Sequence, residues 1–320
     1  MKSILDWCQG YLERQGDSQP LLSAQWLLSE ALGLSRIELY TNYDRPLTEP
    51  ERVTMREWVA RRAAGEPLQL ICGTAAFRYI TVEVRRGVLI PRPETEVLVS
   101  AAVERMGLKP ARAHVVTDEE GAESVQEANE PEALVLDLCT GSGCIACAFA
   151  TEYPQVRVVA SDVDPAALDL ARRNAERLGV ADRVKVVASD YLASLLPAYE
   201  EAFDAIVSNP PYIPTSVLST LDAEVTDYDP SLALDGGEDG LDGFRALLPD
   251  AHRALKPGGT LAVELFEGAL EPAVDLATDV GFLEVAVEND LTGRPRVLVA
   301  RKPGRTGRPS HAAEQVSADG

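Results

Sequence analysis

Histidine is scarce in this chain, and long apolar runs are missing from it. The 320 residues include three histidines, His114, His252 and His311, in no recognisable arrangement with nucleophiles or carboxylates. We therefore expect neither a histidine-based catalytic triad nor a histidine-ligated metal. No run of 18 or more apolar residues occurs, so we expect no membrane span. The first residues hold too short an apolar core for a signal peptide, which favours a cytoplasmic protein.

Basic residues are also in short supply. Lys and Arg number 30 against 51 Asp and Glu, which gives a formal net charge of −21. Proteins that hold nucleic acid neutralise phosphates with Lys and Arg, so we expect no direct nucleic-acid substrate. One local exception is residues 51–92, with eight Arg and four Glu. This segment is either a solvated helix face or a docking surface for an acidic or RNA-bound partner.

The five cysteines are an odd number in a chain without a secretion signal, which argues for reduced thiols. Cys144 and Cys147 have the C-x-x-C spacing of some zinc and redox sites, but no second pair follows. They fall in the first turns of an apolar stretch with helical spacing, which favours buried, inert thiols. We expect no metal site.

Length and periodicity indicate two domains. The chain is 46% apolar, which is enough for two hydrophobic cores. Helical spacing of apolar residues predicts a helical bundle at 1–73. A hairpin linker at 74–93 and an α/β domain at 94–302 follow. Residues 117–132, with seven acidic and no basic side chains, are predicted to be a flexible insertion, and 303–320 a disordered tail.

The hairpin is predicted from a change of period. Ile80, Val82 and Val84 alternate with polar residues, Arg86-Gly87 is a turn signal, and residues 88–90 are expected to form the returning strand. Two prolines then stiffen the loop Pro91-Arg92-Pro93 before a helix that begins near Glu94.

Strands and helices alternate in the second domain. The expected strands are 134–137, 157–161, 184–188, 205–208, 261–265, 283–288 and 296–300, and the expected helices lie near 143–152, 165–178, 240–255 and 269–280. Apolar strands that alternate with helices form a parallel sheet covered on both faces. The last two strands are separated only by a turn, so we expect them to form an antiparallel pair at the sheet edge. This seven-stranded pattern resembles the class I, Rossmann-like methyltransferase fold.

The loop after the first sheet strand is a candidate nucleoside site. It reads Asp137-Leu138-Cys139-Thr140-Gly141-Ser142-Gly143 and opens a helix, where glycine allows a tight turn and free N–H groups face a ligand. Asp162 ends the second strand, where an acidic residue can accept hydrogen bonds from ribose hydroxyls. The loop alone does not separate a dinucleotide from S-adenosylmethionine.

The second candidate site is Asn209-Pro210-Pro211-Tyr212, which we call the acceptor turn. It follows an apolar strand, and its prolines make it stiff and extended. The Asn209 side-chain oxygen and the Pro210 carbonyl are acceptors that can hold the two N–H bonds of a planar NH2 group, and Tyr212 adds a ring for stacking. Such acceptors orient a poorly nucleophilic nitrogen for attack on a sulfonium methyl group without a strong general base. The acceptor turn therefore favours S-adenosylmethionine as cofactor.

Four segments occur in order that together resemble the release factor glutamine methyltransferase family, also called PrmC or HemK. They are residues 65–69 (GEPLQ), 89–96 (LIPRPETE), 209–212 (NPPY) and 233–237 (ALDGG), and the resemblance extends to about residue 302. The acceptor turn by itself also occurs in adenine methyltransferases that act on DNA. Methylation of an exocyclic amine in DNA or RNA is therefore the alternative function, and the net charge of −21 argues against it.

The resemblance implies methyl transfer from S-adenosylmethionine to the side-chain nitrogen (N5) of the glutamine in the Gly-Gly-Gln motif of class I peptide chain release factors. It implies a helical N-terminal domain that helps to hold the release factor. The implied cofactor-binding residues are Cys139, Thr140, Gly141, Ser142, Gly143, Asp162, Asp190, Tyr191 and Asn209. The implied catalytic residues are Asn209 and Pro210, and Pro211 and Tyr212 join them in substrate binding.

Overall fold

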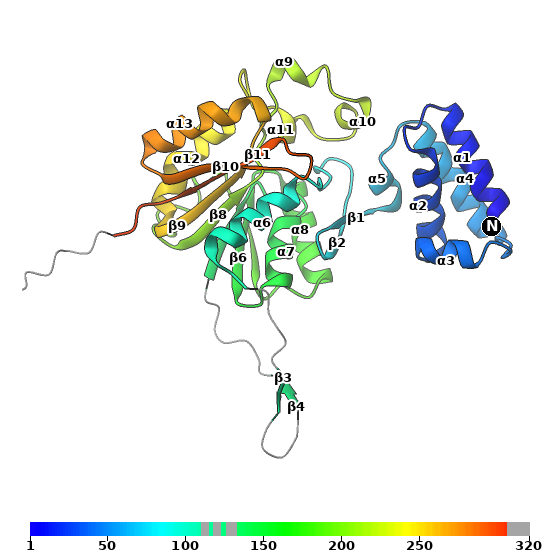
Figure 1. Ribbon diagram of the computed structural model, residues 1–320, viewed down its shortest axis with the longest axis horizontal. Helices are drawn as coiled ribbons and strands as arrows, with labels where there is room; N and C mark the ends of the chain where they lie inside the picture. The colour runs from blue at the N-terminus through cyan, green and yellow to red at the C-terminus, as the bar shows by residue number, and fades with distance from the viewer. Residues whose placement is uncertain (110–114, 118–122, 126–132, 306–320) are drawn as a thin grey trace, which may run out of the picture.

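The N-terminal helices form a body with its own core. The computed structural model describes residues 1–109, 115–117, 123–125 and 133–305. The first helices are α1 (Lys2–Arg14), α2 (Pro20–Leu32), α3 (Arg36–Thr41), α4 (Glu49–Ala63) and α5 (Leu68–Cys72). Their buried faces meet around Leu12, Leu27 and Leu28. Figure 1 shows this group beside the sheet domain, and it confirms the predicted helical region.

The hairpin between the two bodies differs from the sequence prediction. Strand β1 (Thr74–Phe77) pairs antiparallel with β2 (Ile80–Glu83), so the hairpin turn lies at Arg78-Tyr79. The predicted turn at Arg86-Gly87 does form, but no returning strand follows it. Residues 88–90 form no strand, because Val88 and Ile90 pack against other parts of the chain. Val88 packs against α8 of the sheet domain, and Ile90 is buried in the main core. The period-2 pattern at residues 80–84 was correct, but its predicted partner was wrong.

The second body is a seven-stranded sheet with the order β10-β11-β9-β8-β5-β6-β7. Its strands are β5 (Ala133–Leu138), β6 (Val156–Asp162), β7 (Val184–Ala188), β8 (Phe203–Ser208), β9 (Leu255–Glu264), β10 (Leu283–Asn289) and β11 (Pro295–Arg301). Strands β5 to β9 are parallel, and β11 is antiparallel to both β9 and β10. The predicted strands and the antiparallel edge pair are therefore confirmed.

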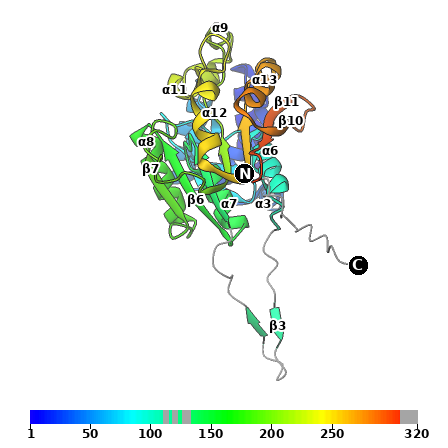
Figure 2. The ribbon, with the colours of Figure 1, turned by 90° about the vertical axis from the view of Figure 1, so that its left-hand side faces the viewer.

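Helices cover both faces of this sheet (Figures 1 and 2). One face packs against α6 (Thr95–Met106), α7 (Cys144–Glu152) and α8 (Pro165–Arg177), and the other against α12 (Asp242–Ala254) and α13 (Leu270–Val280). Successive side chains of a strand point to opposite faces, so Val135 joins the first core and Leu136 the second. This two-sided burial explains why the central strands are apolar at nearly every position.

Short elements complete the described chain. After β8 come α9 (Thr215–Leu218), α10 (Ala223–Thr226) and α11 (Ser231–Leu234), and a 3-10 turn, Glu267–Ala269, precedes α13. Strand β3 (Val115–Thr117) ends at the first residue of the predicted insertion 117–132 and pairs with β4 (Glu123–Val125) inside it. The rest of that segment and residues 306–320 of the predicted tail lie outside the described residues. No helix in the described part of the chain is long and apolar enough to cross a membrane.

The Arg-rich segment 51–92 is occupied by internal ion pairs. Seven of its eight arginines lie within 4.0 Å of a carboxylate: Arg52, Arg56, Arg61, Arg62, Arg78, Arg85 and Arg92. Arg62 of α4 joins the two bodies, because its guanidinium binds Glu224 of α10 at 3.0 Å. It also binds Asp17 of its own body at 2.7 Å. Most of the arginines in this segment therefore form ion pairs within the chain.

Candidate active site

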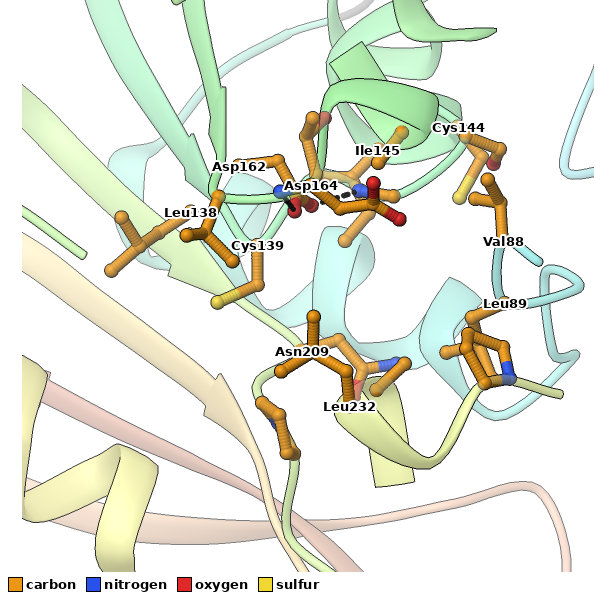
Figure 3. Close-up of a pocket in the computed structure, with 18 of the residues that line it drawn as sticks. Val88, Leu89, Leu138, Cys139, Cys144, Ile145, Asp162, Asp164, Asn209 and Leu232 are labelled. Carbon is orange, nitrogen blue, oxygen red and sulfur yellow. Dashed lines mark hydrogen bonds between the residues drawn. The ribbon is translucent and has the colours of Figure 1, made fainter. Parts of the chain in front are cut away.

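The candidate site is a cavity at the carboxyl ends of β5, β6, β7 and β8. This is where an open α/β sheet binds ligands, next to the point at which the strand order reverses. Figure 3 shows Asp162 and Asp164 on the side formed by the loop after β5, with Asn209 and Leu232 across the cavity. Other lining residues come from the linker (Val88, Leu89, Pro91, Arg92), from the start of α6 (Thr95), from the segment after β7 (Ser189, Asp190, Tyr191) and from the α11 region (Pro230, Ala233).

The buried carboxylate of Asp137 shapes the loop that joins β5 to α7. Its Oδ2 accepts hydrogen bonds from the Thr140 hydroxyl at 2.6 Å and from the Ala146 backbone N–H at 3.0 Å. Burial raises the pKa of Asp137 to about 7, and these two bonds partly offset that rise. These hydrogen bonds fix the conformation of the loop before α7. Within the loop, Cys139 has a φ of 61°, in the left-handed region that favours glycine.

Asp162 connects this loop to the next strand. Its Oδ2 accepts from the Gly141 backbone N–H and its Oδ1 from that of Asp164, both at 2.9 Å. Each carboxylate oxygen has a second lone pair, so the side chain can still accept two hydrogen bonds from a ligand. Burial raises the pKa of Asp162, and the backbone N–H bonds oppose that rise.

The acceptor turn is held by contacts on both sides. The Asn209 side-chain Nδ2 donates to the Thr95 hydroxyl at 3.1 Å, which leaves its Oδ1 as the free end of the amide. The Tyr212 hydroxyl donates to Glu264 at 2.9 Å. Burial beside this carboxylate raises the pKa of Tyr212 well above its ordinary value, so the hydroxyl keeps the proton that it donates. Among the described residues, the Pro210 carbonyl accepts no backbone hydrogen bond.

Glycines 236 and 240 pack directly against the backbone of the acceptor turn. A Cβ on Gly236 would lie 2.7 Å from Tyr212 Cα, and one on Gly240 would lie 2.4 Å from the Tyr212 carbonyl oxygen. The Ile213 N–H donates to the Leu234 carbonyl, and the Gly236 N–H donates back to the Ile213 carbonyl, both at 2.9 Å. Residues 234–240 therefore hold the end of the acceptor turn through close backbone contacts and two hydrogen bonds.

Replacement of Gly236 by alanine is expected to displace the acceptor turn. The Gly236 backbone has no left-handed φ, so the effect comes from the close approach of the added Cβ to the backbones of Tyr212 and Gly240. We expect Gly236→Ala to lower the free energy of unfolding by roughly 1–3 kcal/mol and to reduce kcat more than cofactor affinity. Thermal unfolding and methyl-transfer assays measure both effects. Gly304→Ala is the matched control, because a Cβ there meets open space; equal behaviour of the two variants would contradict the packing argument.

The structure brings most of the sequence-predicted site residues to one cavity. Those that line it are Cys139, Thr140, Gly141, Ser142, Asp162, Asp190, Tyr191, Asn209 and Pro211. Gly143, Pro210 and Tyr212 are not among the lining residues. Gly143 instead lets α7 approach α8, since a Cβ there would lie 2.9 Å from the Ala171 Cβ. Tyr212 points its hydroxyl at Glu264.

Sequence reasoning missed several residues that support the site. Thr95 and Glu264 contact the acceptor turn, and Asn174 binds the Ser142 carbonyl at 2.9 Å and both backbone groups of Glu83. One available signal was Glu264 itself, a charged residue directly after the apolar run Leu261-Ala262-Val263. The linker also contacts the segment before α11, because Arg92 forms an ion pair with the buried side chain of Asp229.

Two of the cysteines near the site, Cys144 and Cys147, are buried thiols. Cys144 and Cys147 lie inside α7, and burial raises the pKa of Cys147 to about 12, so the thiol form is strongly favoured. All five cysteines are free. Within the described residues, no group of three or more His, Cys, Asp or Glu side chains could hold a metal ion.

Comparison with known proteins assigns the family. Residues 3–73 match the PrmC N-terminal domain, and residues 122–223 match the methyltransferase small domain. The release factor glutamine methyltransferase of Geobacter sulfurreducens is 42% identical over 94% of this chain and 96% of its own length. The chain belongs to the release factor glutamine methyltransferase family. The members from Rhodopirellula baltica (37% identical over 93% of this chain and 95% of theirs) and Mycolicibacterium smegmatis (38% over 96% and 99%) also align end to end.

Membership of the release factor glutamine methyltransferase family makes this chain a methyltransferase. Its fold agrees, since the sheet order and the antiparallel edge are those of the class I methyltransferase expected from the sequence. A solved methyltransferase structure from Pyrococcus furiosus aligns with a TM-score of 0.41 and 25% identity over 54% of this chain and 77% of that chain.

Proposed function

We propose that this chain transfers a methyl group from S-adenosylmethionine to the N5 side-chain nitrogen of the glutamine in the Gly-Gly-Gln motif of class I peptide chain release factors. The observation that carries the proposal is the fixed amide of Asn209. Its Nδ2 is engaged by Thr95 at 3.1 Å, so its Oδ1 can accept one N–H of a substrate amide while the Pro210 carbonyl accepts the other. End-to-end similarity to relatives of that name supports the choice of substrate.

The acceptor turn lowers the barrier by orientation and by electrostatics. The lone pair of an amide nitrogen is delocalised, so the nitrogen attacks poorly unless its plane is held toward the electrophile. Two acceptor oxygens on its N–H bonds also favour the positive charge that grows on nitrogen as the new N–C bond forms. The nitrogen then releases one proton to solvent, which gives the neutral N-methyl amide.

The residues of the cavity fit S-adenosylmethionine. When bound, this cofactor supplies an electrophilic methyl group on a sulfonium, and a neutral thioether is left after transfer. We propose that Asp162 accepts from the ribose hydroxyls with its free lone pairs, and that Asp190 and Tyr191 contact the adenine side. Residues 139–143 would offer the glycine-opened backbone at the start of α7.

We propose that the two bodies have different roles. The sheet domain, 94–302, carries the chemistry, while the helices of 1–73 and the linker 74–93 help to hold the release factor. The ion pair of Arg62 with Glu224 supports this, because it connects the N-terminal helices to α10. Helix α10 leads into the α11 segment that borders the cavity.

A labelling experiment tests the proposed reaction. Purified protein is incubated with methyl-labelled S-adenosylmethionine and with a release factor, the same release factor with alanine at the acceptor glutamine, or a mixture of DNA and RNA. We expect label on the unmodified release factor alone. Label on the nucleic acid alone would contradict the proposed substrate.

A further inference from the structure

Arg92 is a charged residue of the cavity that the proposed reaction does not use. It belongs to the linker, and its side chain is 31% exposed. Among the described residues that line the cavity, Arg92 is the one cation, whereas three are carboxylates: Asp162, Asp164 and Asp190. Like charges repel an anion and an opposite charge attracts it. Arg92 is therefore the lining side chain whose charge favours an anionic group in this cavity.

An ion pair holds one end of the Arg92 guanidinium. Its Nη2 donates to Asp229 Oδ2, and the side chain of Asp229 is fully buried. The Ile90 backbone N–H donates to the other oxygen of this carboxylate at 3.3 Å. A guanidinium has five N–H donors, and in the described part of the chain Nε and Nη1 of Arg92 donate no hydrogen bond. The ion pair thus fixes the side chain and leaves donors for a ligand.

The backbone of Arg92 lies next to residues that hold the acceptor turn. The Thr95 N–H donates to the Arg92 carbonyl at 3.1 Å, and the Thr95 hydroxyl accepts from Asn209 Nδ2 at 3.1 Å. Figure 3 shows Leu89 of the linker across the cavity from Cys139. The linker therefore forms a wall of the cavity that begins beside the proposed site of the acceptor nitrogen.

The proposed cofactor carries one anion, the carboxylate of its amino-acid group. In the covalent order of S-adenosylmethionine, the sulfur stands between the ribose and this amino-acid group. With the ribose at Asp162 and the methyl group toward Asn209, the amino-acid group is left to the part of the cavity that the linker and Thr95 form. A planar guanidinium presents parallel N–H donors that match the two oxygens of a carboxylate.

We propose that Arg92 binds the carboxylate of the cofactor's amino-acid group, and that this contact makes the cavity select a nucleoside that carries an amino acid. This inference rests on the proposed function and assigns Arg92 a binding role in it. Nucleosides with the same adenine, ribose and sulfur but no carboxylate are the ligand class that the contact disfavours.

Two ligands that differ only in the carboxylate test this role. S-adenosylhomocysteine and its decarboxylated analogue, which keeps the ammonium group, are titrated into the full-length protein by calorimetry. We expect the wild-type protein to bind S-adenosylhomocysteine at least about tenfold more tightly than the analogue, because a hydrogen bond between charged groups has an effect of this size. A preference below about twofold would contradict the inference without any variant.

Arg92→Gln separates ligand binding from support of the fold. The variant keeps an N–H donor for Asp229 but removes the charge and the guanidinium. We expect the Kd for S-adenosylhomocysteine to rise by about 10- to 100-fold, and the Kd for the decarboxylated analogue to change by less than about threefold. Arg92→Met, which keeps the apolar stem, should lose the preference in the same way. Thermal unfolding shows whether each variant is folded.

Arg172→Gln is the matched control. Arg172 is exposed on α8 and does not line the cavity, so this variant makes the same change in net charge and should leave both Kd values unaltered. An equal loss of affinity for the two ligands in Arg92→Gln would mean that Arg92 only supports the structure, and the inference would be wrong.

The outcomes separate this inference from the proposed function. If Arg92→Gln keeps the wild-type preference between the two ligands while the wild-type protein labels release factor, the inference is wrong and the proposed function stands. If the wild-type protein binds neither ligand and labels no release factor, both are wrong.

Discussion

Asn209→Ala is expected to lower kcat for methyl transfer by about 10²- to 10³-fold. The variant removes the oxygen that holds the acceptor nitrogen, and loss of one preorganised hydrogen-bonding group in an active site has effects of this size. Cofactor affinity should stay within a few-fold of the wild-type value, because the proposed ribose and loop contacts come from Asp162 and residues 139–143. Single-turnover methyl transfer and calorimetric titration of S-adenosylhomocysteine measure the two quantities.

Asn289→Ala is the matched control for this variant. Asn289 is exposed at the end of β10, so the same substitution there should leave both rate and affinity unaltered. Full activity of Asn209→Ala would show that the acceptor nitrogen is held by other groups. A loss of cofactor binding as large as the loss of rate would instead mean that Asn209 serves the cofactor.

Asp162→Ala should show the opposite pattern, with cofactor binding affected first. Hydrogen bonds to a charged group contribute about 1.5–3 kcal/mol, so we expect the Kd for S-adenosylmethionine to rise by about 10- to 150-fold. The Gly141 and Asp164 N–H groups also lose their acceptor, which loosens the loop after β5. At saturating cofactor, kcat should recover to within about tenfold of the wild-type value. Calorimetry and rate measurements over a range of cofactor concentrations provide the test.

Two further variants sharpen the result. Asp162→Asn retains one acceptor oxygen but adds a donor, so it should weaken binding about as much as Asp162→Ala. Asp275→Ala removes an exposed carboxylate on α13 and controls for the change in net charge. Unchanged cofactor affinity in both Asp162 variants would exclude this side chain from the cofactor site.

The sheet domain was predictable because its signals are local and repeated. The strand pattern of 134–137 and 205–208, with a glycine loop after the first and Asn-Pro-Pro-Tyr after the second, places both loops at carboxyl ends. The linker was predicted less well, because the choice between two partners for residues 80–83 depends on a distant contact. Val88 packs on Ala167 and Leu170 of α8, which no pattern near residue 88 indicates.

The sequence by itself determined the fold class, the family and the chemical types at the candidate site, since these depend on strand periodicity and on short motifs whose backbone properties are local. The tertiary structure alone decided how those groups are oriented. Asn209 is oriented by Thr95 from the start of α6, Tyr212 by Glu264 from the end of β9, and the turn beneath them by Gly236. These partners are separated from the turn by up to 114 positions in sequence, so only packing of the sheet and its helices brings their polar atoms within hydrogen-bonding distance.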